Sequence, residues 1–166
     1  MKKRLNKKAI ADYNYLKSIG IHPKYLMRIY KTGHDYLINK LYNKAIREFT
    51  DAIELYPRFA LAYEGRGVAY GKKKLYDKAI YNFTQAIKIN TKYSKVYYLR
   101  GLAYYRKSLL EKSCNDFCQA GLLYLQQGNQ AGVLECIAMI KLVYPSSSLI
   151  IKLLDEIHKS KSRKKK

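Results

Sequence analysis

Small and large apolar positions recur along this chain at a fixed spacing of 34 residues. Within one period, Tyr63, Gly67 and Tyr70 stand at i, i+4 and i+7, which places them on one side of an α-helix. Ala79 and Phe83 begin the same pattern on a second helix. The aligned sets are Gly33, Gly67 and Gly101; Tyr36, Tyr70 and Tyr104; Leu41, Leu75 and Leu109; Ala45, Ala79 and Ser113; Phe49, Phe83 and Phe117; and Ala52, Ala86 and Ala120.

Each period is therefore predicted to fold as two antiparallel helices. Gly71 and the polar stretch Lys72–Lys74 end the first helix. Asp77 and, one period earlier, Asn43 are the expected N-caps of the second helix, with Glu111 as a poorer cap in the third period. A single hairpin cannot bury both apolar stripes, so neighbouring hairpins must stack into a solenoid.

The pattern resembles the tetratricopeptide repeat family, in which an aromatic residue, Leu-Gly, Tyr, Ala, Phe, Ala and a closing Pro recur. The aromatic place holds Ile29, Tyr63 and Tyr97, the Leu place holds Thr32, Arg66 and Arg100, and the closing place holds Pro57, Thr91 and Leu125. The resemblance implies an all-α, right-handed solenoid of helix-turn-helix repeats. Its three 34-residue units span 26–59, 60–93 and 94–127.

Flanking segments are expected to cap this stack. Residues 9–25 are predicted to form an N-terminal capping helix, a partial repeat with its helix at Lys8–Ile19, and residues 128–158 two closing helices near Gln130–Val143 and Leu149–Ile157. Residues 1–8 and 159–166 form basic tails, and the C-terminal one is expected to be disordered.

Composition adds a strong positive charge to this picture. The 166 residues include 33 Lys and Arg against 12 Asp and Glu, a formal net charge of +21, while 48% of the chain is apolar. That apolar share excludes a disordered protein, and no uninterrupted apolar stretch is long enough to span a bilayer. We predict no secretion signal, and three cysteines, an odd number, favour a reducing, cytoplasmic location.

Catalytic motifs are missing from the sequence, which predicts that the protein is not an enzyme. The sequence contains no phosphate-binding glycine loop, zinc-protease motif or nucleophile elbow. Cys114, Cys118 and Cys136 fall at or beside packing stripes, where cysteine serves as a small apolar residue. We therefore expect no metal, no cofactor and no small-molecule substrate.

One face of the first helices lies apart from the core stripe, and the resemblance implies that it lines a concave groove for partner peptides. Most of its positions are apolar or aromatic, which favours an interaction surface. The basic residues Lys72, Lys95 and Arg106 are expected toward one end, where an acidic partner residue could pair with them. The predicted groove residues are Met27, Tyr30, His34, Leu37, Ile38, Leu61, Glu64, Val68, Gly71, Lys72, Lys95, Tyr98, Leu102, Tyr105 and Arg106.

The hypothesis that follows is a protein-interaction module: a scaffold, adaptor or assembly factor that binds a segment of another protein. The closing helices or a second copy of the chain are alternative occupants of the groove, and the oligomeric state stays open. The alternative function is a basic surface whose Lys-rich tails make weak, non-specific contacts with nucleic acid or anionic lipid. Codon bias is another explanation for part of the positive charge.

One subfamily grips a terminal carboxylate with a Lys and Asn cluster, and this chain lacks most of it. Tyr30, His34 and Gly65 stand where the resemblance would require Lys, Asn and Asn, and Leu99 replaces an Arg. Lys95 alone matches. The carboxylate-binding function is therefore not expected here.

Overall fold

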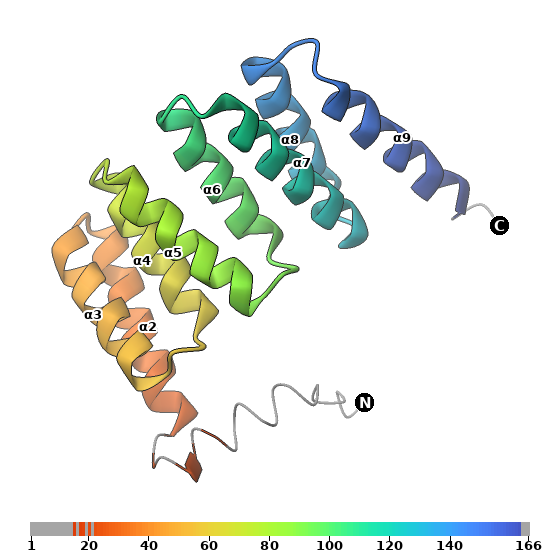
Figure 1. Cartoon of the computed structure of the whole chain (residues 1–166). Coiled ribbons are helices and arrows are strands. Elements are labelled where there is room, and N and C mark those ends of the chain that lie inside the picture. The colour runs from red at the N-terminus through yellow and green to blue at the C-terminus, as the bar shows by residue number, and fades with distance from the viewer. Residues whose placement is uncertain (1–14, 16, 19, 21, 164–166) are drawn as a thin grey trace.

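The computed structural model describes residues 15, 17, 18, 20 and 22–163, and the described residues form eight α-helices and no strand (Figure 1). This confirms the predicted all-α class and its helical-repeat solenoid. The helices are α2 (Pro23–Ile38), α3 (Tyr42–Leu55), α4 (Ala60–Lys72), α5 (Tyr76–Ile89), α6 (Ser94–Arg106), α7 (Leu110–Gln126), α8 (Gln130–Val143) and α9 (Ser148–Arg163).

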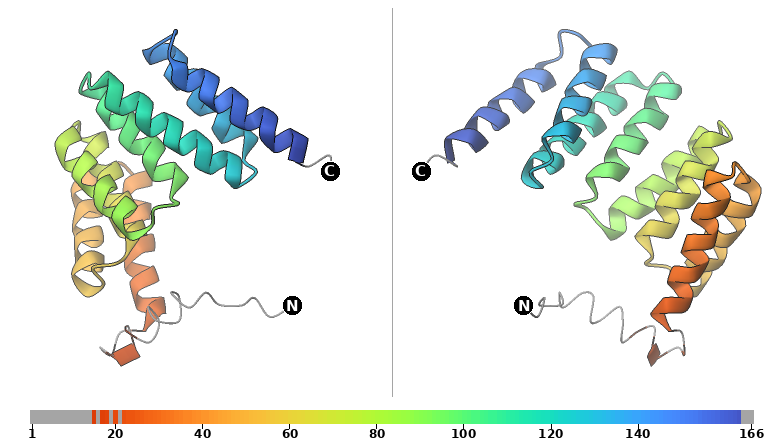
Figure 2. Two further views of the ribbon diagram at one scale, coloured as in Figure 1. Left: turned by 45° about the vertical axis from the view of Figure 1, so that its right-hand side comes forward. Right: turned by 180° about the vertical axis from the view of Figure 1, so that it is seen from behind.

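Helices that follow one another in the chain pack together, so the fold is a stack of hairpins. Figures 1 and 2 show α2, α4, α6 and α8 in one layer and α3, α5 and α7 in the other. Within the described residues, α2 also packs on α4 and α4 on α6, whereas no comparable packing joins α3 to α5 or α5 to α7. The layer of α2, α4 and α6 is therefore the inner side of the curve, which we call the inner face.

The predicted stripes form the core of each hairpin. Ala45 and Phe49 in α3, and Ala79 and Phe83 in α5, are buried with at most 3% of their surface exposed. Ser113 takes the alanine place in α7, and its buried hydroxyl donates to the Gly101 carbonyl oxygen over 2.9 Å. This bond satisfies a polar group that would otherwise cost stability in the core.

The turn inside each hairpin repeats with the same period as the core. Lys40, Lys74 and Ser108 adopt left-handed backbone conformations, with φ of 58°, 61° and 58°. In the first turn, Lys40 N–H donates to the Leu37 carbonyl and Leu41 N–H to the Tyr36 carbonyl, and the other two turns repeat both bonds. This is the Schellman pattern that closes a helix C-terminus.

The predicted N-caps are wrong because this closure leaves no residue free for capping. The leucine that ends each Schellman turn, Leu75 for example, already occupies the N-cap position of the next helix and provides no side-chain hydrogen bond. Asp77 and Glu111 thus lie inside the first turn of their helices. Asp77 forms an ion pair with Lys107 instead, and Asn43 accepts a hydrogen bond from Lys73.

The flanking segments differ in part from expectation. α8 spans Gln130–Val143 as predicted, and α9 packs against α7 and α8 with Leu153 fully buried. α9 continues through Arg163, so the basic segment up to that residue is helical, not the disordered tail we expected. α2 begins at Pro23, upstream of the expected start of the first repeat, and most of the capping helix predicted at 8–19 lies outside the described residues.

Candidate functional site

The inner face presents most of the predicted groove residues to solvent, fully or in part. Glu64 is the exception, since only 5% of its surface is exposed. The exposed members are Met27, His34, Ile38, Lys72, Lys95 and Arg106, and the half-buried ones are Tyr30, Leu37, Leu61, Val68, Gly71, Tyr98, Leu102 and Tyr105. The face is therefore a partly apolar surface with positive charges at separate points.

Glu64 is the centre of a polar cluster near the start of α6. Its carboxylate lies 2.6 Å from the Lys95 ammonium and accepts a hydrogen bond from the Tyr93 hydroxyl. Burial and Glu64 together raise the pKa of Tyr93 and of Tyr30 above the usual tyrosine range. Burial opposes the positive charge on Lys95, but Glu64 outweighs that effect and raises the pKa of Lys95.

This cluster corrects the expected grouping of positive charges. Lys95 lies in the first turn of α6, whereas Arg106 is the last residue of that helix, about 16 Å away at the helical rise. Lys72 likewise ends α4. Lys72 and Arg106 therefore share one end of the inner face, and Lys95 is held by Glu64 at the other.

Tyr98 has a structural role that the sequence pattern did not indicate. Its ring centroid lies 5.4 Å from that of Phe117, and its hydroxyl donates to the Glu135 carboxylate in α8 over 2.7 Å. Burial and that hydrogen bond raise the pKa of Tyr98. Tyr98 thus joins α6 to α8 and is only partly available to a ligand.

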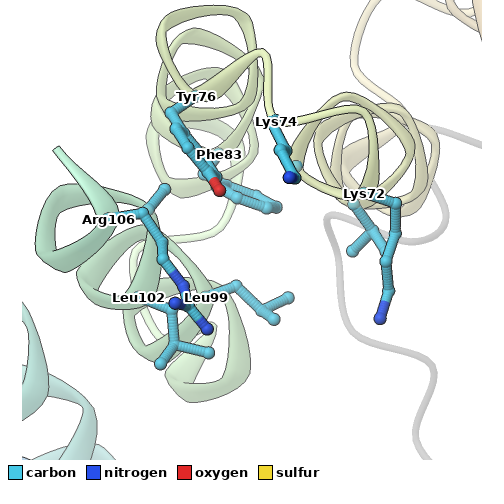
Figure 3. A pocket seen from close by; sticks show the side chains of 10 residues that line it. Lys72, Lys74, Tyr76, Phe83, Leu99, Leu102 and Arg106 are labelled. Carbon is cyan, nitrogen blue, oxygen red and sulfur yellow. The ribbon is translucent and has the colours of Figure 1, made fainter.

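A cavity of about 440 Å³ opens where α4 and α6 end. Its apolar wall includes Val68 of α4 and Leu99 and Leu102 of α6. Figure 3 shows positive side chains on two sides of the cavity, Arg106 from α6 on one side and Lys72 and Lys74 from the end of α4 and the turn after it on the other. The full lining is Val68, Gly71, Lys72, Lys74, Tyr76, Phe83, Leu99, Leu102, Ala103 and Arg106.

Several lining residues were missed by the sequence reasoning. Lys74 is in the turn after α4, and Tyr76 begins α5, so neither lies on the helix face from which the groove was predicted. Leu99 also lines the cavity, whereas the sequence marks it only as a departure from the carboxylate-binding pattern. The 34-residue period could have placed Lys74 in a turn, because Lys74 occupies the same position in its repeat as Lys40 and Ser108 do in theirs.

The described acidic, histidine and cysteine side chains do not gather into a metal site, and the cysteines are buried. No group of three or more His, Cys, Asp or Glu residues in the described part of the chain could hold a metal ion. All three cysteines are buried, and burial raises the pKa of Cys136 to about 12, which keeps its thiol protonated and a poor nucleophile. Across the described ranges, no helix combines the length and the apolar character that crossing a bilayer requires.

Comparison with known proteins places this geometry in context. A family model described as a TPR repeat matches residues 75–108, which include α5 and α6. No match to a curated protein sequence was found.

Solved structures share the fold over most of the chain. PcrH of Pseudomonas aeruginosa, solved in complex with the chaperone-binding region of PopD, is 18% identical with a TM-score of 0.71, and the match covers 75% of this chain and 94% of that one. The TPR2B domain of yeast Sti1, in an Hsp70 complex, is 16% identical with a TM-score of 0.69, covering 74% of this chain and 98% of that one.

A third structure has a more similar sequence. The second TPR domain of Spaghetti (RPAP3), bound to the HSP90 peptide SRMEEVD, is 30% identical with a TM-score of 0.58, and the match covers 59% of this chain and 91% of that one. The repeat model, this sequence identity and the shared hairpin stack agree. The chain belongs to the tetratricopeptide repeat family.

Proposed function

We propose that this protein is an interaction module whose inner face binds a segment of another protein. The observation that carries the proposal is the cavity at the ends of α4 and α6, with its aliphatic wall and positively charged rim. Beyond the cavity, the half-buried Tyr105 on α6, the half-buried Leu61 on α4 and the exposed Met27 on α2 add apolar side chains to the inner face. Soluble proteins seldom leave such surfaces without a partner.

The similar structures support this use of the fold. Three of them hold a segment of another protein: PcrH with a region of PopD, Sti1 TPR2B with Hsp70, and Spaghetti with an HSP90 peptide. The carboxylate-binding pattern of Lys and Asn does not extend to this chain, because its one matching cation, Lys95, is paired with Glu64.

The molecule's own C-terminal helix leaves this surface accessible. α9 packs on α7 and α8, and both views in Figure 2 place it at the end of the stack, away from α2 and α4. The occupant we propose is therefore a segment of a different protein and not the closing helices.

Peptide selection followed by matched tyrosine variants tests the proposal. Peptides from a random display library are selected on the full chain, and their affinities are measured by calorimetry. Tyr105→Ala removes an inner-face anchor and should weaken binding by about tenfold or more, as expected for a tyrosine hot spot. Tyr81→Ala removes a tyrosine that is 59% exposed on α5, in the other layer, and should leave the affinity unchanged.

The choice of variant follows from the contacts. Tyr98→Ala would also remove the Phe117 packing and the hydrogen bond to Glu135, and would therefore confuse stability with binding. Failure to enrich any peptide, or equal affinities of the two variants, would contradict the proposal. Preferential binding of single-stranded RNA over peptides would instead favour the basic-surface alternative.

A further inference from the structure

The cavity at the ends of α4 and α6 combines an aliphatic interior with a positively charged rim, and one ligand could contact both. Val68, Leu99 and Leu102 provide aliphatic contact inside it, while Lys72, Lys74 and Arg106 stand at the rim (Figure 3). Its volume of about 440 Å³ lies within the range of roughly 300–1,000 Å³ typical of ligand pockets. The cavity is large enough for an apolar side chain with parts of its neighbours.

The rim carries positive charge that the described chain does not neutralise. Among the ion pairs formed by the described residues, none involves Lys72, Lys74 or Arg106. In the part of the chain that the structure describes, no acidic residue lines the cavity. Asp77, at the start of α5, is engaged by Lys107. All three rim side chains are exposed, so an incoming negative group can reach them without first displacing an internal partner.

We infer that this cavity recognises an acidic protein segment in which Asp or Glu residues flank an apolar side chain. The inference rests on the proposed function and specifies the chemistry of the partner. The apolar side chain enters against Leu99 and Leu102, and the flanking carboxylates pair with the rim cations. The net charge of +21 adds long-range attraction for such a partner and speeds its association.

The lining favours an acidic peptide over nucleic acid. Proteins that bind single strands present aromatic faces on which bases stack. Two aromatic residues line this cavity: Phe83 has only 3% of its surface exposed, and Tyr76 is half-buried, so the cavity does not offer the series of open ring faces on which successive bases stack. The accessible floor is aliphatic, which suits a leucine, isoleucine or methionine side chain.

The experiment uses the full chain and peptides recovered from the display selection. Enriched peptides should contain an apolar residue between acidic ones. Lys72→Glu combined with Lys74→Glu should weaken their binding at least about tenfold and reduce its dependence on salt. Lys88→Glu combined with Lys92→Glu is the matched control, because it makes the same change in net charge at two exposed lysines away from the cavity.

The peptide is varied in parallel. Replacing its acidic residues by Gln, or its apolar residue by Ser, should each reduce affinity about tenfold. Lys72→Gln with Arg106→Gln serves as a second variant that avoids placing negative charge at helix C-termini, and circular dichroism checks that all variants fold.

The outcomes separate this inference from the proposed function. If Tyr105→Ala weakens binding but both cavity variants bind normally, or if the enriched peptides lack acidic residues, the inference is wrong and the inner-face proposal stands. If none of these variants changes binding, both are wrong. If the control pair weakens binding as much as the cavity pair, net charge and not this cavity accounts for recognition, and the inference is also wrong.

Discussion

A glycine of the first helix packs closely against a phenylalanine of the second helix in each repeat hairpin. A Cβ atom added at Gly67 would lie 2.6 Å from a ring carbon of Phe83, and one at Gly101 would lie 2.8 Å from a ring carbon of Phe117. These rings are buried and cannot move aside without disturbing the core. The recurring glycine is thus required by close approach between two helices.

Two glycines of the same helix provide a matched test of that requirement. Gly67→Ala should reduce the free energy of unfolding by about 1–3 kcal/mol, because overpacking outweighs the gain in helix propensity. At Gly71 the nearest side-chain atom to an added Cβ is 4.0 Å away, so Gly71→Ala should stabilise the protein by about 0.5–1 kcal/mol. Urea denaturation measures both, and equal effects would contradict the packing assigned to Gly67.

At the scale of elements, arginines link successive hairpins through a polar ladder. Arg66 in α4 donates to Asn82 of α5 over 2.8 Å and to Thr50 of α3 over 3.0 Å. One period later, Arg100 in α6 contacts Asp116 of α7 and Thr84 of α5. The place that the family pattern gives to leucine thus holds residues that join each hairpin to the one before it.

The partners of the two arginines differ in charge, since Arg66 binds a neutral amide and Arg100 binds a carboxylate. We therefore predict different losses of stability when each arginine is replaced. Arg100→Leu leaves Asp116 buried without its partner and should cost about 3–5 kcal/mol. Arg66→Leu leaves a neutral amide and should cost about 1–3 kcal/mol. Thermal and urea unfolding measure both variants.

A double variant tests whether the unpaired Asp116 carboxylate causes the loss of stability in Arg100→Leu. Arg100→Leu combined with Asp116→Leu should recover most of the lost stability, because it removes the uncompensated charge. If the double variant is no more stable than Arg100→Leu alone, the unpaired carboxylate is not what destabilises the single variant.

At the scale of the whole molecule, the stack buries phenol and thiol groups along its inner and closing parts. Burial and carboxylate hydrogen bonds raise the pKa values of Tyr93 and Tyr98, and burial raises the pKa of Cys136 to about 12. Each folded-state pKa lies above the unfolded value. The folded protein therefore retains protons at alkaline pH that the unfolded chain releases.

Stability should consequently fall in alkaline solution. These groups contribute their full stabilisation below about pH 8.5, the pKa of cysteine in the unfolded chain. The contribution of Cys136 declines above that pH, and the contributions of the tyrosines decline above about pH 10, the pKa of tyrosine in the unfolded chain. Urea midpoints measured near pH 7.5 and pH 10.5 should differ, with the lower midpoint at high pH. Tyr98→Phe should flatten this dependence, and a midpoint independent of pH would disprove the argument.

The sequence alone determined the repeat, the hairpin and the order of the stack. Apolar spacing along a helix is a local property, so Gly67, Phe83 and the bounds of α8 could be predicted without coordinates. The N-caps could not, because Asp77 lost its expected place to a turn closed by backbone hydrogen bonds.

Only the tertiary structure decided which charges are available to a partner. Lys95 and Lys72 look alike in the sequence, yet Lys95 is neutralised by Glu64 of the preceding hairpin, while Lys72 meets Lys74 and Arg106 at an open cavity. The physical reason is that charge pairing depends on distances between side chains that stacking brings together from distant parts of the chain. Periodicity places residues on a face, and stacking selects their neighbours.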